Sequence, residues 1–336
     1  MSRALSTLLA SVGCVTACAT SAIGASPSLR AQAVFSAAAL PREALDLPAL
    51  RLPPAAVVRL GPRARRPGGR VYVSVNIDAQ VAIFEQRSPH YEVGAIFNML
   101  FPSSVDLDTE RNIYVSDQLE DIIDVFRPNA LEPTTFLYDS GEPIDVKVDG
   151  RGQVAASVFV SYSQAGTVEV FRPGGRYPFQ SLNDSAIEQP YFVTYDAKGN
   201  LYVDGLSSSG TAVVGVYPKG SRTLTVLPVT IVFPGGLAID QNGNLLVCDQ
   251  GNGLGSTLYV YPPNAKNPST SFSLGAGNDV ETFALAADGT ALFTADVTQG
   301  ASEEYSYPGG NLLGRIPVPD SLVRPGYGVS GVATTP

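Results

Sequence analysis

Short apolar runs separated by polar turns fill the chain from about residue 70 to its end. One example is Val105-Asp106-Leu107, which is followed by a polar stretch and then by Ile113-Tyr114-Val115. Runs of this length, bounded by Gly, Pro, Asn and Asp, predict β-strands joined by tight turns. Within residues 67–336 no stretch has the spacing of an amphipathic helix. The pattern therefore predicts an all-β fold.

The same order of strands and turns recurs along the chain. Each copy has a Pro, two small or apolar residues, an apolar run, an Asp, a tight turn, a second apolar run, a polar loop, and a third run ending in an aromatic residue. The residue after the turn recurs every 41 to 47 residues. A repeat of this length with a fourth, outer strand is typical of a β-propeller blade. The copies cover 102–126, 143–171, 190–217 and 234–261, with a weaker copy at 280–307 and half of one at 69–84.

An aspartate precedes the tight turn in four of the copies. Asp108, Asp149, Asp196 and Asp240 each lie six residues after the Pro of their repeat. Asp hydrogen-bonds its own backbone in such turns, and a following Gly supplies a positive φ. We therefore expect these four residues to stabilise hairpins on the face opposite the ligand side.

The two ends of the repeat region complement each other. Residues 331–336 match a first strand with nothing after it, and residues 69–74 match a second strand with nothing before it. Joined, they complete one blade and remove an exposed strand edge. Residues 67–336 are therefore predicted to form a six-bladed β-propeller, closed by pairing of the C-terminal strand with the N-terminal hairpin.

The first residues have the pattern of a targeting segment. In residues 1–25, Arg3 precedes an apolar stretch that is too short to span a bilayer. Val15-Thr16-Ala17-Cys18 resembles a bacterial lipobox, which implies lipidation at Cys18; the alternative is an ordinary secretory signal cleaved near residues 22–24. Residues 26–66, rich in Pro, Ala and Arg, are interpreted as a linker. We expect an exported protein, either an outer-membrane or periplasmic lipoprotein or a secreted one.

Composition narrows the partners. The formal net charge of −9 argues against nucleic acid and against direct binding to anionic membrane, so membrane contact is expected only through a lipid anchor. We expect a monomer. Cys248 lies alone in a strand and is predicted to be a small buried residue. The single histidine, His90, lies on a predicted loop and is expected to be exposed, which argues against a zinc site.

The repeat resembles a known family. Residues 190–204 and 234–249 are similar to the NHL repeat and to its bacterial six-bladed relatives, which include gluconolactonase-like propellers. That resemblance implies the fold but says little about activity, because propellers carry many unrelated functions. Gluconolactonase-like propellers hold a divalent metal in the central funnel. Their Glu-Gly-Pro-Trp signature is absent here, and the chain has no Trp.

Aspartates at the ends of second strands are the candidate metal ligands. Asp117 and Asp249 occupy the same repeat position in blades half a ring apart, while Asp204 lies one residue early and Asp296 one residue late. Carboxylate oxygens suit Ca²⁺, which takes six to eight oxygen ligands. The alternative, which the pattern favours, is that each Asp hydrogen-bonds its own turn.

Aromatic residues beside the repeat prolines are the candidate ligand contacts. Phe101, Tyr191 and Phe233 flank prolines at the loops that enter the innermost strands, and Tyr327 is grouped with them. Aromatic side chains exposed at a funnel mouth favour a peptide or sugar ligand. Packing between blades is the other interpretation of the same residues.

Two functions follow from these observations. The first, which we favour, is a non-catalytic binding or scaffold protein without a cofactor, for a protein, peptide or glycan of the cell envelope. The alternative is a Ca²⁺-dependent lactonase or hydrolase of the gluconolactonase-like type, using Asp117, Asp249 and Asp204. A purely structural repeat protein is a third reading.

Overall fold

The computed structural model describes residues 68–130, 132–161, 164–251, 254–275, 278–318 and 328–336. The predicted signal peptide with Cys18, the predicted linker and Tyr327 lie outside these residues. Among the described residues, no helix is both long and apolar enough to cross a membrane.

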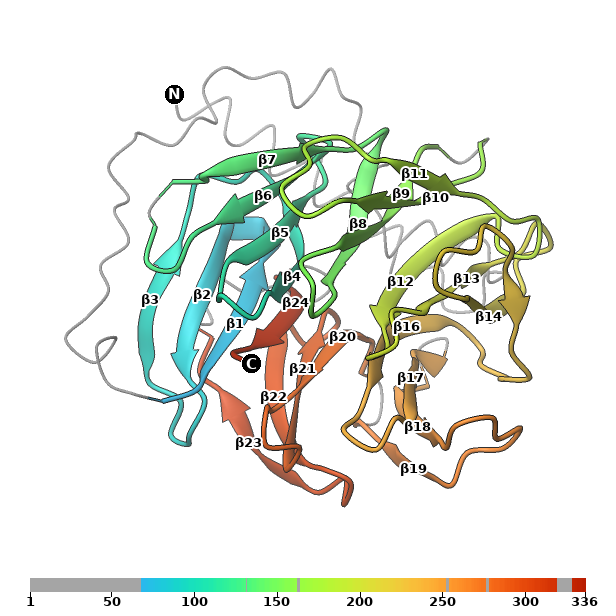
Figure 1. Cartoon of the computed structure of the whole chain (residues 1–336). Coiled ribbons are helices and arrows are strands. Elements are labelled where there is room, and N and C mark those ends of the chain that lie inside the picture. Colours follow the sequence, from blue (N-terminus) through green and yellow to red (C-terminus); the bar gives the residue numbers. More distant parts are fainter. Residues whose placement is uncertain (1–67, 131, 162–163, 252–253, 276–277, 319–327) are drawn as a thin grey trace, which may run out of the picture. The chain divides into compact units, whose positions relative to one another are not determined.

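Six four-stranded antiparallel sheets make up the fold (Figure 1). The all-β, six-bladed prediction is therefore confirmed. From the innermost strand outward, the blades are β24 (Val329–Thr334), β1 (Arg70–Val75), β2 (Gln80–Glu85) and β3 (Glu92–Ile96); β4 (Pro102–Leu107), β5 (Ile113–Asp117), β6 (Ile122–Phe126) and β7 (Thr135–Tyr138); β8 (Glu142–Val148), β9 (Val154–Phe159), β10 (Thr167–Phe171) and β11 (Gln180–Leu182); β12 (Gln189–Tyr195), β13 (Leu201–Leu206), β14 (Ala212–Tyr217) and β15 (Thr225–Val226); β16 (Pro234–Ile239), β17 (Leu245–Asp249), β18 (Thr257–Tyr261) and β19 (Thr270–Ser273); and β20 (Val280–Leu285), β21 (Ala291–Asp296), β22 (Ala301–Ser306) and β23 (Leu312–Ile316).

The first blade contains both ends of the repeat region. Strand β24 pairs antiparallel with β1, from Val71 opposite Thr334 to Val75 opposite Val329. Beyond this ladder, the Thr335 amide donates to the Arg70 carbonyl at 3.0 Å, and the Arg70 amide donates to Thr335 Oγ1 at 2.9 Å. The closure predicted from the sequence is confirmed.

The core lies between neighbouring blades. Each apolar cluster joins the strands of two adjacent blades; one, for instance, unites Val73 and Phe84 of blade 1 with Phe293 of blade 6. The aromatic residue near the end of each third strand is buried in every blade. These residues are Phe84, Phe126, Phe171, Tyr217, Tyr261 and Tyr305. Alternation along each strand thus fills the interfaces from both sides.

The hairpin aspartates stabilise their turns, as predicted. Asp196 Oδ1 accepts hydrogen bonds from the Lys198 and Asn200 amides, and Oδ2 accepts one from Asn200 Nδ2 at 2.7 Å. The backbone bonds are repeated at the other three positions. Gly199 has a φ of 87°, which a residue with a Cβ rarely adopts.

Hydroxyl groups connect the innermost strands near their starts. Each of β4, β8, β12, β16 and β20 has a register shift near its start, where the pairing with its partner strand is irregular. Ser330 Oγ donates to the Ser103 carbonyl at 2.9 Å, and Ser103 Oγ donates to the Ile144 carbonyl at 3.0 Å. A Cβ on Gly331 would overlap the Ser103 carbonyl oxygen. Small and hydroxylated residues therefore allow the strands to approach closely around the central channel.

Candidate functional site

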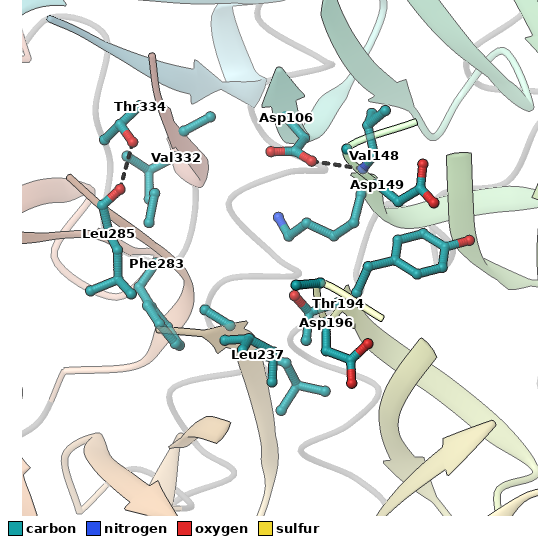
Figure 2. A pocket seen from close by; sticks show the side chains of 18 residues that line it. Asp106, Val148, Asp149, Thr194, Asp196, Leu237, Phe283, Leu285, Val332 and Thr334 are labelled. Carbon is teal, nitrogen blue, oxygen red and sulfur yellow. Dashed lines mark hydrogen bonds between the residues drawn. The ribbon is translucent and has the colours of Figure 1, made fainter. Parts of the chain in front are cut away.

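A cavity of about 310 Å³ lies at the ends of the innermost strands, on the side of the hairpin turns (Figure 2). Residues from β4, β8, β12, β16, β20 and β24 all line it. Contacts between successive innermost strands close the ring around this channel. Every blade therefore contributes to one space on the ring axis.

The lining is polar on one side and apolar on the other. At the position two residues before the hairpin Asp, blades 2, 3 and 4 carry Asp106, Lys147 and Thr194. The equivalent position in blades 5, 6 and 1 carries an alanine, and larger apolar side chains lie beside it (Figure 2). The apolar side comprises Ala238, Ala284, Ala333, Leu237, Phe283 and Val332. A ligand with one polar and one apolar face would match this arrangement.

Lys147 carries the positive charge of the cavity. Its Nζ lies 3.5 Å from Asp145 Oδ1. Burial disfavours the charged form, but the carboxylates of Asp145 and Asp106 outweigh it, so the pKa of Lys147 is raised. The ammonium therefore persists at neutral pH, and its three donors exceed the one acceptor that Asp145 provides among the described residues.

Asp145 links three blades. Its Oδ1 accepts a 2.5 Å hydrogen bond from Ser104 Oγ on β4, and its Oδ2 accepts one from the Val193 amide on β12 at 2.9 Å. The carboxylate is buried, with 1% exposure. These bonds fix the group that positions Lys147, so the lysine is held by the scaffold rather than by solvent.

Asp106 is the acidic group of the cavity wall. Its Oδ2 accepts a hydrogen bond from the Val148 amide at 2.8 Å. Burial raises the pKa of Asp106, against the opposing effects of Lys147 and of that amide. The cavity thus places an acceptor, Asp106, near a donor, Lys147, with the Thr194 hydroxyl able to do either.

The predicted metal ligands Asp117 and Asp249 hold loop backbone. Asp117 accepts hydrogen bonds from the Leu100 and Phe101 amides, at 2.5 and 2.9 Å. Asp249 accepts from the equivalent amides of residues 232 and 233, at 2.9 and 3.1 Å. Both carboxylates therefore fix the loop that enters the innermost strand of their own blade.

Asp204 is positioned differently from these two. Its Oδ1 accepts a hydrogen bond from the Phe192 amide at 3.0 Å, but Oδ2 is buried without a hydrogen-bond partner. Burial raises the pKa of Asp204 well above its usual value. Across the described ranges, no group of three or more His, Cys, Asp or Glu side chains is arranged to hold a metal ion. A calcium site at Asp117, Asp249 and Asp204 stays a prediction.

The register of blade 6 corrects one placement. Asp296 was expected one residue beyond the position of Asp117 and Asp249, but it pairs with Val280 as Asp117 pairs with Pro102. The hairpin of blade 6 is one residue longer, since Leu285 pairs with Leu292 where Leu107 pairs with Ile113. The extra residue shifts the sequence alignment and not the strand.

The predicted aromatic contacts are largely buried. Tyr191 and Phe233 have 3% and 6% exposure, and their rings meet edge to face with centroids 5.8 Å apart. Phe101 is half-buried. The Tyr191–Phe233 pair joins blades 4 and 5, which is packing between blades; the ligand-binding role of these residues stays a prediction.

The prediction that His90 is exposed was wrong. Its exposure is 1%; Nε2 lies 3.1 Å from Glu304 Oε2, and Nδ1 lies 3.2 Å from the Glu85 carbonyl oxygen. The β2–β3 loop packs this ring edge to face on Phe293 of blade 6. Cys248, in contrast, is fully buried as predicted, and burial raises the pKa of its thiol.

Sequence reasoning missed Asp106, Lys147 and Thr194 as site residues. The signal was present in the repeat alignment, because the same column holds alanine or a threonine, a lysine or an aspartate. Residues that vary at a fixed position facing a shared axis are the ones that distinguish otherwise equivalent blades.

No protein-family model matches the chain, and a comparison with curated proteins also finds no match. Solved structures do match. A chain of the nidogen/laminin complex is 15% identical with a TM-score of 0.65, covering 80% of this chain and 99% of that chain. A functionally unknown protein from Desulfotomaculum acetoxidans is 15% identical with a TM-score of 0.54, covering 78% and 86%.

Hydrazine synthase of Kuenenia stuttgartiensis is a third similar structure. It is 12% identical with a TM-score of 0.54, covering 70% of this chain and 75% of that chain. Identities this low establish a shared fold and nothing about activity. The fold conclusion therefore stands independently of the strand assignment.

Proposed function

We propose that this protein is a non-catalytic binding protein that takes its ligand in the hairpin-side cavity of the central channel. The two-sided lining carries the proposal. Lys147, Asp106 and Thr194 offer donors and acceptors on one side, and Phe283 with its apolar neighbours offers a surface on the other. Sites of this kind use a few convergent polar groups for orientation and apolar groups for contact area.

Among protein, peptide and glycan ligands, the lining favours a glycan. A sugar hydroxyl both donates and accepts, so adjacent hydroxyls can satisfy Asp106 and Lys147 together. The C–H face of a sugar ring packs on apolar and aromatic side chains such as Phe283. The volume of about 310 Å³ is at the small end of ligand cavities, which suits one or two sugar units.

The test is isothermal titration with N-acetylglucosamine oligosaccharides and neutral disaccharides. Thr194→Val removes one hydroxyl at constant shape, so affinity should fall about five- to tenfold if that hydroxyl bonds the ligand. Ala284→Leu fills the apolar side and should abolish binding. Thr270→Val, on the exposed outer strand β19, is the matched control and should bind like the parent. Equal affinity in all four proteins would exclude this cavity as the site.

We also propose that the protein is exported and lipid-anchored at Cys18, on the strength of the lipobox-like sequence. Export leaves membrane contact to the lipid alone. Labelling with radioactive palmitate in a Gram-negative host should mark the parent and not Cys18→Ser. Label retained by Cys18→Ser would place the lipid elsewhere, and release of unlabelled parent into the medium would favour the ordinary secretory signal.

The alternative, a calcium-dependent lactonase, draws support from Asp204, whose buried Oδ2 has no hydrogen-bond partner. An unpaired buried carboxylate oxygen carries a desolvation cost that a cation would offset. Lactone hydrolysis that requires calcium, and that Asp204→Asn eliminates while the protein remains folded, would establish this function. Absence of hydrolysis with calcium present would leave binding as the role.

A further inference from the structure

Three blades carry an acidic residue at the same position of their third strand. Asp124, Glu169 and Glu303 each lie two residues before the aromatic that packs between blades. All three are buried, with exposures of 1 to 3%. In blade 6 the acid is neutralised, because Arg315 Nε lies 2.8 Å from Glu303 Oε1 and the Tyr305 hydroxyl donates to Oε2 at 2.6 Å.

Glu169 has no equivalent of that arginine. Arg315 stands directly opposite Glu303 in the β22–β23 ladder, whereas Ser181 stands opposite Glu169 in the β10–β11 ladder. Glu169 Oε2 is buried without a hydrogen-bond partner. The same position is therefore compensated in blade 6 and lacks a side-chain cation in blade 3.

A second carboxyl from the next blade faces Glu169 instead. Asp139 follows the outer strand β7 of blade 2, and its carboxyl lies within hydrogen-bonding reach of Glu169. Both Asp139 oxygens are buried without a hydrogen-bond partner. Burial, followed by the proximity of Glu169 and Asp121, raises the pKa of Asp139 well above its usual value. Within the described residues, neither Asp139 nor Glu169 forms an ion pair with Lys, Arg or His.

We propose that Asp139 and Glu169 bind one Ca²⁺ ion between blades 2 and 3. Three buried carboxylate oxygens converge there, and a single shared proton would satisfy two of them, whereas a cation can contact all three. Oxygen-only donors favour a hard cation, and calcium completes its shell with carbonyls and water. The ion would do in blade 3 what Arg315 does in blade 6.

The site is independent of the binding cavity and of Asp117, Asp249 and Asp204. Asp139 begins the connection from β7 to the innermost strand β8, and the Tyr138 amide donates to the Arg176 carbonyl of blade 3 at 2.9 Å. An ion at this point would therefore brace the interface between two blades. Two side chains are fewer than a high-affinity site provides, so we expect a dissociation constant in the range of about 0.1–1 mM.

Thermal melting of the full chain, stripped with EDTA and titrated with CaCl₂ against NaCl of equal ionic strength, tests the proposal. Calcium at 5 mM should raise Tm by about 2–5 °C in a saturable manner. Glu169→Gln and Asp139→Asn should each abolish the rise. Asp124→Asn, at the same strand position in blade 2, is the matched control and should keep it, as should the Asp117→Ala, Asp249→Ala double variant.

Terbium luminescence gives a second readout that needs no variant. The chain has no Trp, so excitation near 280 nm reaches tyrosines, and Tyr138 adjoins Asp139. Bound Tb³⁺ should therefore emit with a stoichiometry of one per chain and be displaced by Ca²⁺. Tyr138→Phe should weaken the emission without changing the calcium-dependent rise in Tm.

Several results would overturn the proposal. One is a Tm that does not respond to calcium while it rises on acidification, because the pair would then share a proton and not a cation. Another is a calcium response that survives in both Glu169→Gln and Asp139→Asn. A third is a response lost in the Asp117→Ala, Asp249→Ala protein, which would place the ion at the loops and support the lactonase reading.

Discussion

Removal of residues 329–336 is the perturbation that most directly tests the ring. The deletion takes away β24 and the Thr335 contacts with Arg70. Val329 and Val332 are essentially fully buried, so their loss alone costs roughly 3–6 kcal/mol. Five paired positions of β1 would also lose their partners and become an exposed edge. A single domain is stable by only about 5–15 kcal/mol, so most of its stability would be lost.

Differential scanning calorimetry and size-exclusion chromatography with light scattering measure the outcome. We expect Tm to fall by roughly 10 °C or more and the truncated protein to self-associate through β1. Removal of Pro336 alone, which is exposed, should have no effect. A peptide of residues 328–336 added in trans should restore part of the lost Tm. A truncated protein that melts like the parent and stays monomeric would refute the closure of the ring through β24.

Two further predictions concern side chains of the scaffold. Asp196→Ala removes three hydrogen bonds within one hairpin and should destabilise the protein by about 1–2 kcal/mol in urea unfolding, whereas Glu188→Gln, an exposed neighbour, should be neutral; equal stability of the two variants would argue against the capping role. Burial, with repulsion from Asp117 and Glu120, raises the pKa of Asp124 from 3.8 to about 8, so the folded state binds a proton that the unfolded state releases. Stability in EDTA should therefore fall as pH rises from 6 to 8.5, and Asp124→Asn should reduce that fall by roughly 1–3 kcal/mol; an unchanged pH profile would contradict the raised pKa.

The regular part of the molecule could be predicted from sequence because its causes are local. An Asp before a Gly-Asn turn specifies its hairpin within five residues, as Asp196 does. The closure was also predictable, since residues 331–336 match the first strand of the other blades. Even the burial of Cys248 followed from its place in an apolar strand.

Contacts between blades could not be predicted in the same way. His90 is buried by Phe293 and Glu304, which lie far away in the chain and belong to another blade. The pairing of Asp139 with Glu169 likewise depends on how two blades pack, which strand periodicity does not specify. The cavity was missed because its polar side emerges only when the same column of different repeats is projected onto one axis.

The pairing of β24 with β1 also constrains the order of events during synthesis. A ribosome releases the chain from its first residue onward, so five blades can assemble while the earliest hairpin still waits for its innermost neighbour. Contacts between such distant segments form slowly, because a long loop must close before they are rewarded. The last step of maturation is therefore a latch, and nascent chains that stall before residue 329 would accumulate with that hairpin open.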